Sequence, residues 1–155
     1  MRSHELTIGR TFALSFDHGE ELLPTLSEFC RANDIRQGYI PLFVSGFSTL
    51  RIIGTFERLE DPVAPVRSAV HLTNLEAHGA GTIAYDPEHG TTLPHIHVSA
   101  GLKERGALGY TSHLLEATVQ LLTEMVVVEV LAPQLYRRTD PARYGVPILG
   151  FGSGE

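Results

Sequence analysis

The segment PHIHVSAG, residues 94–101, has the alternation of a β-strand that is buried on one face only. Successive side chains of a strand point to opposite faces, so His95, His97 and Ser99 share one face and the apolar residues between them share the other. We expect the apolar face to pack into the core. The two histidines then stand side by side on the face that folding does not need.

The chain turns back after this strand, because a charged loop at 103–106 is followed by a return through 109–113. A return of this length predicts that His113 lies next to His95 and His97. Three imidazoles that converge on one point, with a position left for water or substrate, are typical of a zinc site. We expect zinc as the metal. Other divalent transition metals are not excluded by the sequence, because imidazole also binds nickel, copper and iron.

The rest of the chain predicts several strands, short turns and one clear helix. Alternation at 10–17 indicates a half-buried strand, and 20–33 carries the apolar stripe of an amphipathic helix. Strands are expected to break at Gly46 and near Gly79, and 114–122 fits either a helix or a strand. Further strands are expected at 37–45, 47–57, 71–77, 81–85 and 125–131. Together these elements predict an α+β fold with a mostly antiparallel sheet and one main helix.

The length of 155 residues and the hydrophobic fraction of 43% indicate a single domain, 1–155, with an ordinary core. We expect that core at about 10–131, followed by a tail at 133–155 that wraps over the surface or over a neighbouring subunit. The proline-rich connection at 58–68 is expected to be a surface loop without an assigned role. The near-continuous β-branched run at 125–131 predicts a strand buried on both faces, and it favours a homo-oligomer.

Charge and cysteine content exclude several classes of protein. The formal net charge of -6 argues against direct nucleic-acid binding, since phosphate contacts require clustered Lys and Arg and only Arg137, Arg138 and Arg143 form a small group. The single cysteine, Cys30, excludes an intrachain disulfide and falls on the apolar stripe of the helix. No apolar run reaches the length of a membrane span. These features predict a soluble, cytoplasmic protein.

Short motifs follow one another along the chain in a recognisable order. They are RTF at 10–12, GEEL at 19–22, Gly46, LEAHG at 75–79, HIH at 95–97, SHL at 112–114 and TEMV at 123–126. This order resembles the plants and prokaryotes conserved domain, abbreviated PPC, over about 10–131. The resemblance implies an α+β fold with an antiparallel sheet, a homotrimer, and in some prokaryotic members a metal on the equivalents of His95, His97 and His113.

The resemblance also has two departures. The Gly-Gly-His motif of the family falls on 110–113, where Thr111 and Ser112 replace the glycines. If the family glycines have positive φ, threonine would not easily adopt the same backbone conformation. The position of His113 therefore depends on the backbone conformation at Thr111 and Ser112. In plants the domain is joined to AT-hook motifs in nuclear DNA-associated complexes; this chain has no AT-hook and is similar to the bare prokaryotic domain.

Two functions from different classes are compatible with these observations. The first is a trimeric metal-binding domain of unknown activity, with an open three-histidine site that binds a small-molecule ligand. The second is a non-catalytic assembly or regulatory module associated with DNA-binding partners. His78 is a further candidate ligand, and Glu76 and Glu124 are candidates for orienting the imidazoles, although each fits a surface carboxylate as well. The sequence assigns no catalytic residue and leaves open whether the protein is an enzyme.

Overall fold

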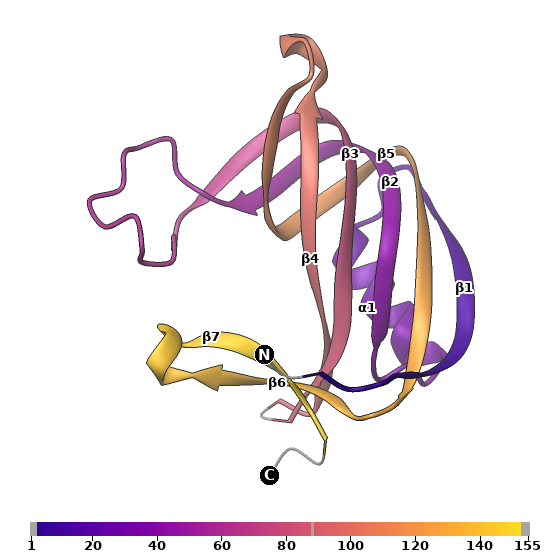
Figure 1. Ribbon diagram of the computed structural model, residues 1–155. Helices are drawn as coiled ribbons and strands as arrows, with labels where there is room; N and C mark the ends of the chain where they lie inside the picture. The colour runs from indigo at the N-terminus through magenta and orange to yellow at the C-terminus, as the bar shows by residue number, and fades with distance from the viewer. Residues whose placement is uncertain (1–2, 88, 153–155) are drawn as a thin grey trace.

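The computed structural model describes residues 3–87 and 89–152, and four strands form a closed barrel at its centre (Figure 1). These strands are β2 (Gly38–Ile53), β3 (Ala69–Asp86), β4 (Thr91–Leu102) and β5 (Leu108–Ala132). Strand β2 pairs with β3, β3 with β4 and β4 with β5, and β5 returns to pair with β2, all antiparallel. The hydrogen-bonded strands therefore form a ring around one core.

Strand β5 is the longest element, with 25 residues, and it connects the ring to the rest of the fold. Its beginning lies against β4, and its end lies between β2 and β1 (Thr7–Asp17). Helix α1 (Leu22–Ala32) follows β1 and contacts β4 and β5. Its residues Leu22, Leu26 and Cys30 are buried, which confirms the helix predicted from the apolar stripe and the core position of the cysteine.

The barrel core is built from apolar residues that alternate along the strands. On β4, Ile96, Val98 and Ala100 are buried, and they belong to one cluster with Phe43 and Phe47 of β2. Full burial of a large apolar side chain contributes about 1.5–3 kcal/mol, so this inward face fixes the strand firmly. The alternation predicted for residues 94–101 is confirmed, and the outward face of β4 is left for other purposes.

The predicted α+β class is wrong, because the chain is mostly β with one short helix of 11 residues. The ambiguous stretch 114–122 belongs to β5. Its leucine spacing imitates a helix because the pairing of β5 with β2 shifts register at several points, and Leu121 has a positive φ of 71°. Such bulges break the period of two that identifies a strand in sequence. The expectation of mainly antiparallel pairing is correct.

The strand breaks expected at Gly46 and Gly79 are also wrong, since β2 and β3 run through both positions. These glycines are required by close approach of neighbouring groups. A Cβ atom at Gly46 would lie 2.5 Å from the backbone oxygen of Gln120, and one at Gly79 would lie 2.5 Å from the ring of Phe43. The strand at 125–131 is real, but it alternates between buried Met125 and Val127 and half-buried residues rather than being buried on both faces.

The tail does not simply wrap over the surface, because it forms a hairpin of β6 (Leu135–Asp140) and β7 (Val146–Phe151). The hairpin joins the barrel through a parallel pairing of Tyr85 in β3 with Tyr136 in β6. Single 3₁₀ turns at Lys103–Arg105 and at 141–143 lie between β4 and β5 and between β6 and β7. In the part of the chain that the structure describes, no helix is long and apolar enough to cross a membrane.

Candidate metal centre

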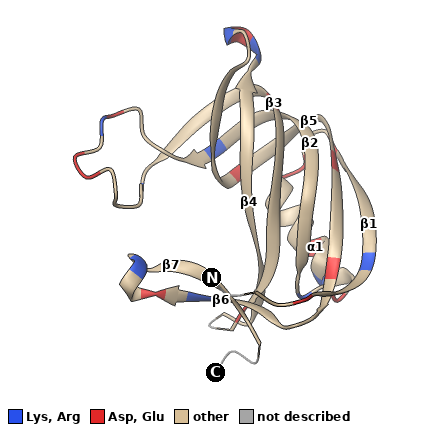
Figure 2. Ribbon diagram, viewed as in Figure 1, with Lys and Arg blue, Asp and Glu red and all other residues tan. Residues whose placement is uncertain are grey.

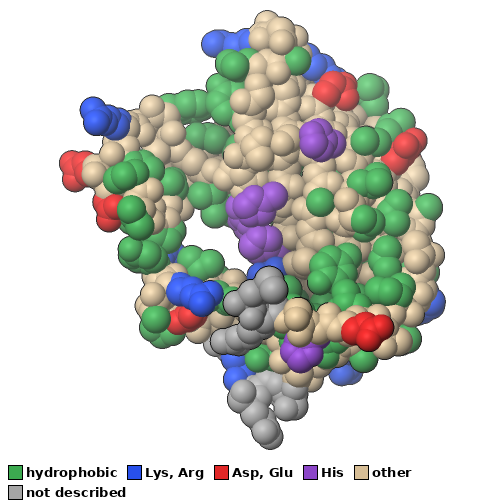
Figure 3. Space-filling view, in the orientation of Figure 1, with side chains coloured by type: hydrophobic (Ala, Val, Ile, Leu, Met, Phe, Trp, Pro, Cys, Tyr) green, Lys and Arg blue, Asp and Glu red, His purple; other side chains and the backbone are tan. Residues whose placement is uncertain are grey.

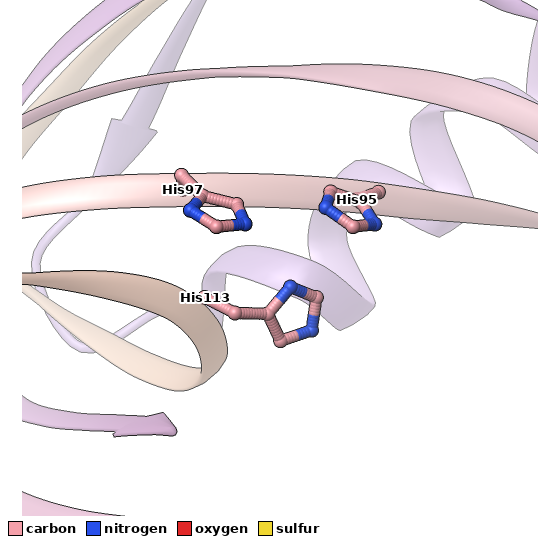
Figure 4. A group of neighbouring side chains, drawn as sticks. All are labelled: His95, His97 and His113. Carbon is pink, nitrogen blue, oxygen red and sulfur yellow. The ribbon is translucent and has the colours of Figure 1, made fainter. Parts of the chain in front are cut away.

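Strands β4 and β5 bring the three predicted histidines together on the outside of the barrel. His97 lies directly opposite His113 in the β4–β5 pairing, and His95 shares the outward face of β4 with His97. Figure 4 shows the rings of His95 and His97 side by side above the ring of His113, which faces them from the neighbouring strand. The juxtaposition predicted from the alternation and the return loop is thus present.

The geometry of the cluster suits a single metal ion. The ring centroids of His95 and His97 are 5.3 Å apart, those of His95 and His113 4.7 Å, and those of His97 and His113 5.6 Å. One nitrogen from each ring lies within 4.8 Å of the other two. Nitrogen ligands of a tetrahedral zinc are about 3.4 Å apart, as follows from Zn–N bonds of about 2.0–2.1 Å. Small ring rotations would close the difference, so these residues fit a zinc-type ion.

The surroundings favour the neutral form of His95 and His113. Burial lowers the pKa of His95 to about 4, helped by the positive charge of Arg137 and by the neighbouring imidazoles. Burial, His97 and Arg137 likewise lower the pKa of His113. None of the three rings has a hydrogen-bond partner among residues 3–87 and 89–152. Neutral imidazoles with free nitrogens are the form that binds a metal.

The replacement of the family glycines does not displace His113. Thr111 and Ser112 lie within β5 in extended conformation, and neither has a positive φ. Thr111 is opposite Ser99 of β4, and their hydroxyl groups are 2.7 Å apart, at hydrogen-bond distance. This side-chain hydrogen bond links the two strands next to the histidines.

The other candidates from the sequence lie outside the cluster. His78 is on β3 opposite Ser99, and it does not belong to the group of converging ligand atoms. The carboxylate of Glu76 is 2.8 Å from the ammonium of Lys103. Glu124 is exposed and lies where β5 pairs with β1 and β2. Neither glutamate is therefore positioned to orient the imidazoles.

Sequence reasoning missed Arg137 and Thr82 as neighbours of the site. Thr82 on β3 lies directly opposite His95, and its hydroxyl accepts a hydrogen bond of 2.6 Å from Nη2 of Arg137. Arg137 comes from β6, so only the parallel β3–β6 contact brings it here. No local pattern indicates such a contact.

The three arginines that formed a small group in the sequence are separated in the structure. Arg138 stacks over the ring of Tyr136 at 5.2 Å, and Arg143 pairs with Asp140 at 3.4 Å, whereas Arg137 turns toward the histidines. Figure 2 shows the remaining Lys and Arg scattered over several elements. In the described residues, the tail therefore presents no compact basic patch.

The histidine cluster lies at the edge of a notch in the surface. Figure 3 shows histidine side chains gathered beside an opening between the barrel, the loop after β2 and the β6–β7 hairpin, with Lys or Arg atoms next to them. Arg67 of this loop donates a hydrogen bond to the backbone oxygen of Tyr144 in the hairpin. The loop and the hairpin are thus joined, and a small molecule can approach the cluster from the notch.

The family described as Plants and Prokaryotes Conserved (PCC) domain matches residues 3–131. The chain belongs to this family. The match covers the whole barrel and all three histidines, but it ends before the β6–β7 hairpin and Arg137. The resemblance to the PPC domain noted from the motifs is therefore confirmed. No curated protein matches the chain.

Several solved structures share the PCC-family fold. A plant- and prokaryote-conserved protein from Pyrococcus horikoshii is 25% identical, with a TM-score of 0.78 and 97% of each chain covered. A protein from Archaeoglobus fulgidus, described as metal-containing, is 22% identical, with a TM-score of 0.76 and coverage of 96% of this chain and 98% of that one. A protein from Ralstonia eutropha, described as a proposed DNA-binding protein, is 22% identical, with a TM-score of 0.72 and 89% of each chain covered.

Proposed function

We propose that this PCC-family protein is a homotrimeric metal-binding protein in which His95, His97 and His113 hold one divalent transition metal, zinc by preference. The observation that carries the proposal is the convergence of one nitrogen from each of the three rings within 4.8 Å. The low pKa values of His95 and His113 support it, because neutral imidazole is the ligand form. The metal-containing Archaeoglobus fulgidus protein has the same fold, which is consistent with the proposal.

The three imidazoles leave the metal an open position. Held by these three residues, a zinc ion would supply Lewis-acid chemistry to a small ligand that reaches the cluster from the notch. The residues of this chain position the ion, and burial favours the neutral form of two of its ligands, His95 and His113. The cluster of candidate ligand atoms contains no carboxylate, so we assign metal and ligand binding without a general base.

The experiment is the metal content of the protein purified without an affinity tag. We expect about one zinc or similar ion per chain, and loss of that ion in the double variant His95→Ala/His97→Ala. The double variant His71→Ala/His78→Ala is the matched control, because it removes two exposed histidines of β3 outside the cluster. Absence of metal from the native protein, even after zinc is added and excess is washed away, would overturn the proposal.

The trimer is proposed from the apolar surface of β1, β2 and β5. Leu42, 52% exposed, lies opposite half-buried Val126, and other apolar side chains are exposed nearby. Figure 3 shows hydrophobic side chains spread over this part of the surface. The exposed large hydrophobic residues on these strands are Ile8, Leu42, Val44, Leu108, Leu121, Leu122 and Leu131. Light scattering at micromolar concentration should give the mass of three chains, and a monomeric mass would refute the trimer.

A second candidate is a non-catalytic assembly module associated with DNA-binding partners. It is favoured by two structures of the same fold, from Ralstonia eutropha and Bacteroides thetaiotaomicron, that are described as proposed DNA-binding proteins. The net charge of -6 and the scattered arginines favour contact through a partner rather than direct contact. A gel-shift titration at several salt concentrations distinguishes direct DNA binding from binding through a partner. Salt-sensitive binding of duplex DNA by the chain alone would contradict the prediction of no direct contact.

A further inference from the structure

The side chain of Arg137 is a half-buried cation without a carboxylate partner among the described residues. Its two hydrogen bonds go to neutral oxygens, from Nη2 to the hydroxyl of Thr82 at 2.6 Å and from Nη1 to the backbone oxygen of Pro147 at 3.4 Å. Its Nε atom is buried and has no hydrogen-bond partner among the described residues. Arg51 also has such an Nε atom, but its guanidinium pairs with Glu116 at 2.7 Å. Arg137 therefore retains unused donor capacity and an uncompensated charge.

Arg137 lies next to the proposed metal ligands. Because Thr82 is directly opposite His95, the hydrogen bond from Arg137 to Thr82 places the guanidinium beside the imidazole of His95. The charge of Arg137 contributes to lowering the pKa of both His95 and His113, which agrees with this proximity. Burial lowers the pKa of Arg137 itself, yet a guanidinium stays protonated at neutral pH.

The charges of the site favour an anionic ligand. Three neutral imidazoles do not compensate a divalent metal, and Arg137 adds a further positive charge. No ion pair of Arg137 with a carboxylate occurs within the described part of the chain. Bringing a second cation close to a metal in a partly buried site is costly unless a negative ligand lies between them.

We propose, resting on the metal site proposed above, that Arg137 is the anion-binding residue of this site and that the ligand is a small carboxylate. A small carboxylate would accept two hydrogen bonds from the guanidinium fork, and one of its oxygens would also face the open position of the metal. The planar fork of an arginine offers two parallel N–H groups that match the two oxygens of a planar carboxylate. A single fork favours this ligand over a phosphate, which usually requires donors from several residues.

The test uses the full chain loaded with cobalt(II), whose visible absorption reports on its ligands, and acetate as the probe. In the wild-type protein we expect acetate to change the spectrum in a saturable manner. Arg137→Gln should bind one cobalt per chain with an unchanged acetate-free spectrum, and its acetate dissociation constant should rise at least tenfold. Arg138→Gln is the matched control, since that neighbouring side chain is exposed and stacks on Tyr136.

The outcomes separate the two proposals. If the wild-type protein binds no cobalt, the metal site fails. If it binds cobalt and acetate, but Arg137→Gln binds acetate as well as Arg138→Gln does, the assignment of Arg137 is wrong. Binding of inorganic phosphate in place of acetate, with the same dependence on Arg137, would overturn the choice of a carboxylate. If Arg137→Gln does not fold, Arg137→Lys replaces it: it keeps the charge but loses the fork, and unchanged acetate affinity in this variant refutes bidentate binding.

Discussion

Two polar clusters on the barrel differ in how completely their groups are paired. At the junction of β1 and β5, Glu129 accepts hydrogen bonds from the backbone nitrogen, Nε and Nη2 of Arg10, at 2.8–3.1 Å. Another hydrogen bond runs from Nη2 of Arg10 to the backbone oxygen of Asn33. At the histidine face, three imidazoles point toward one another without partners, and Nε of Arg137 is unpaired within the described residues.

The difference separates a structural role from a ligand-binding role. Buried polar groups that are fully paired stabilise one arrangement of the chain, whereas buried groups left unpaired reduce stability unless something else binds them. The Arg10–Glu129 junction needs no additional partner and ties β1 to β5. The histidine face, by contrast, leaves the donors and acceptors of its imidazoles free for a ligand.

The largest expected effect is on stability, and it should occur at the junction. Glu129→Ala removes three hydrogen bonds to a residue that is 8% exposed. It should lower the free energy of unfolding by about 1–2 kcal/mol, because water hydrates the released arginine and offsets part of the loss. In the presence of chelator, His95→Ala/His97→Ala should change it by less than about 0.5 kcal/mol, because those rings form no hydrogen bonds. Urea denaturation at one fixed protein concentration measures both.

The control for this comparison is Glu124→Ala, which removes an exposed carboxylate from the same strand. Its stability should equal that of the wild type. If the metal-free double histidine variant lost as much stability as Glu129→Ala, the distinction between a structural junction and a ligand-binding face would be wrong, because the imidazoles would then stabilise the fold themselves.

A further effect on stability should appear on acidification of the metal-free protein. Folded His95 resists protonation down to a pKa of about 4, whereas the unfolded residue titrates near 6.5. The unfolded state therefore binds more protons between these values, and stability should fall as the pH decreases from 6.5 to 4. The pKa of Glu129 is lowered by hydrogen bonding to Arg10, so its contribution should be lost only as the pH falls below the ordinary glutamate value of 4.5.

The two regions can thus be distinguished by pH. Urea denaturation at pH 7, 5.5 and 4.5 should show a decrease for the wild type that is smaller in His95→Gln. In Glu129→Gln the free energy of unfolding should decrease over this pH range as much as in the wild type, because the carboxylate of Glu129 is protonated only at lower pH. An equal decrease in His95→Gln and in the wild type would mean that His95 is not the group responsible.

Sequence reasoning succeeded where the information was local. The period of two at residues 94–101 requires only the pleat of one strand, and the approach of His113 requires only a short return. The helix stripe with Leu22 and Leu26 is equally local. The fold class was wrong because the one predicted helix is short, whereas the strands are long and close into a barrel, which no local pattern reveals. Bulges in β5, including Leu121 with positive φ, disturb the strand period and left 114–122 open between helix and strand.

The contacts of Arg137 illustrate what a single sequence does not provide. Its place beside His95 depends on the parallel pairing of β6 with β3, between residues that are far apart in the chain. In the sequence it is one of several arginines in the tail, and composition suggests only a small basic group. Gly46 shows the same limitation in another form: close approach of β5 requires the glycine, whereas the sequence pattern indicates the end of a strand.

A modest effect is expected where this chain departs from the family motif. Thr111→Gly restores the glycine, removes the hydrogen bond to Ser99 and increases the freedom of the unfolded chain, so stability should fall by about 0.5–1 kcal/mol. Zinc stoichiometry should not change, because the backbone at Thr111 is already extended and His113 is held by its pairing with His97. Calorimetric titration with zinc and urea denaturation of the same variant measure both quantities. Loss of zinc binding in Thr111→Gly would show that the contact between Thr111 and Ser99 positions His113, and the histidine face would then depend on its surrounding hydrogen bonds as the Arg10–Glu129 junction does.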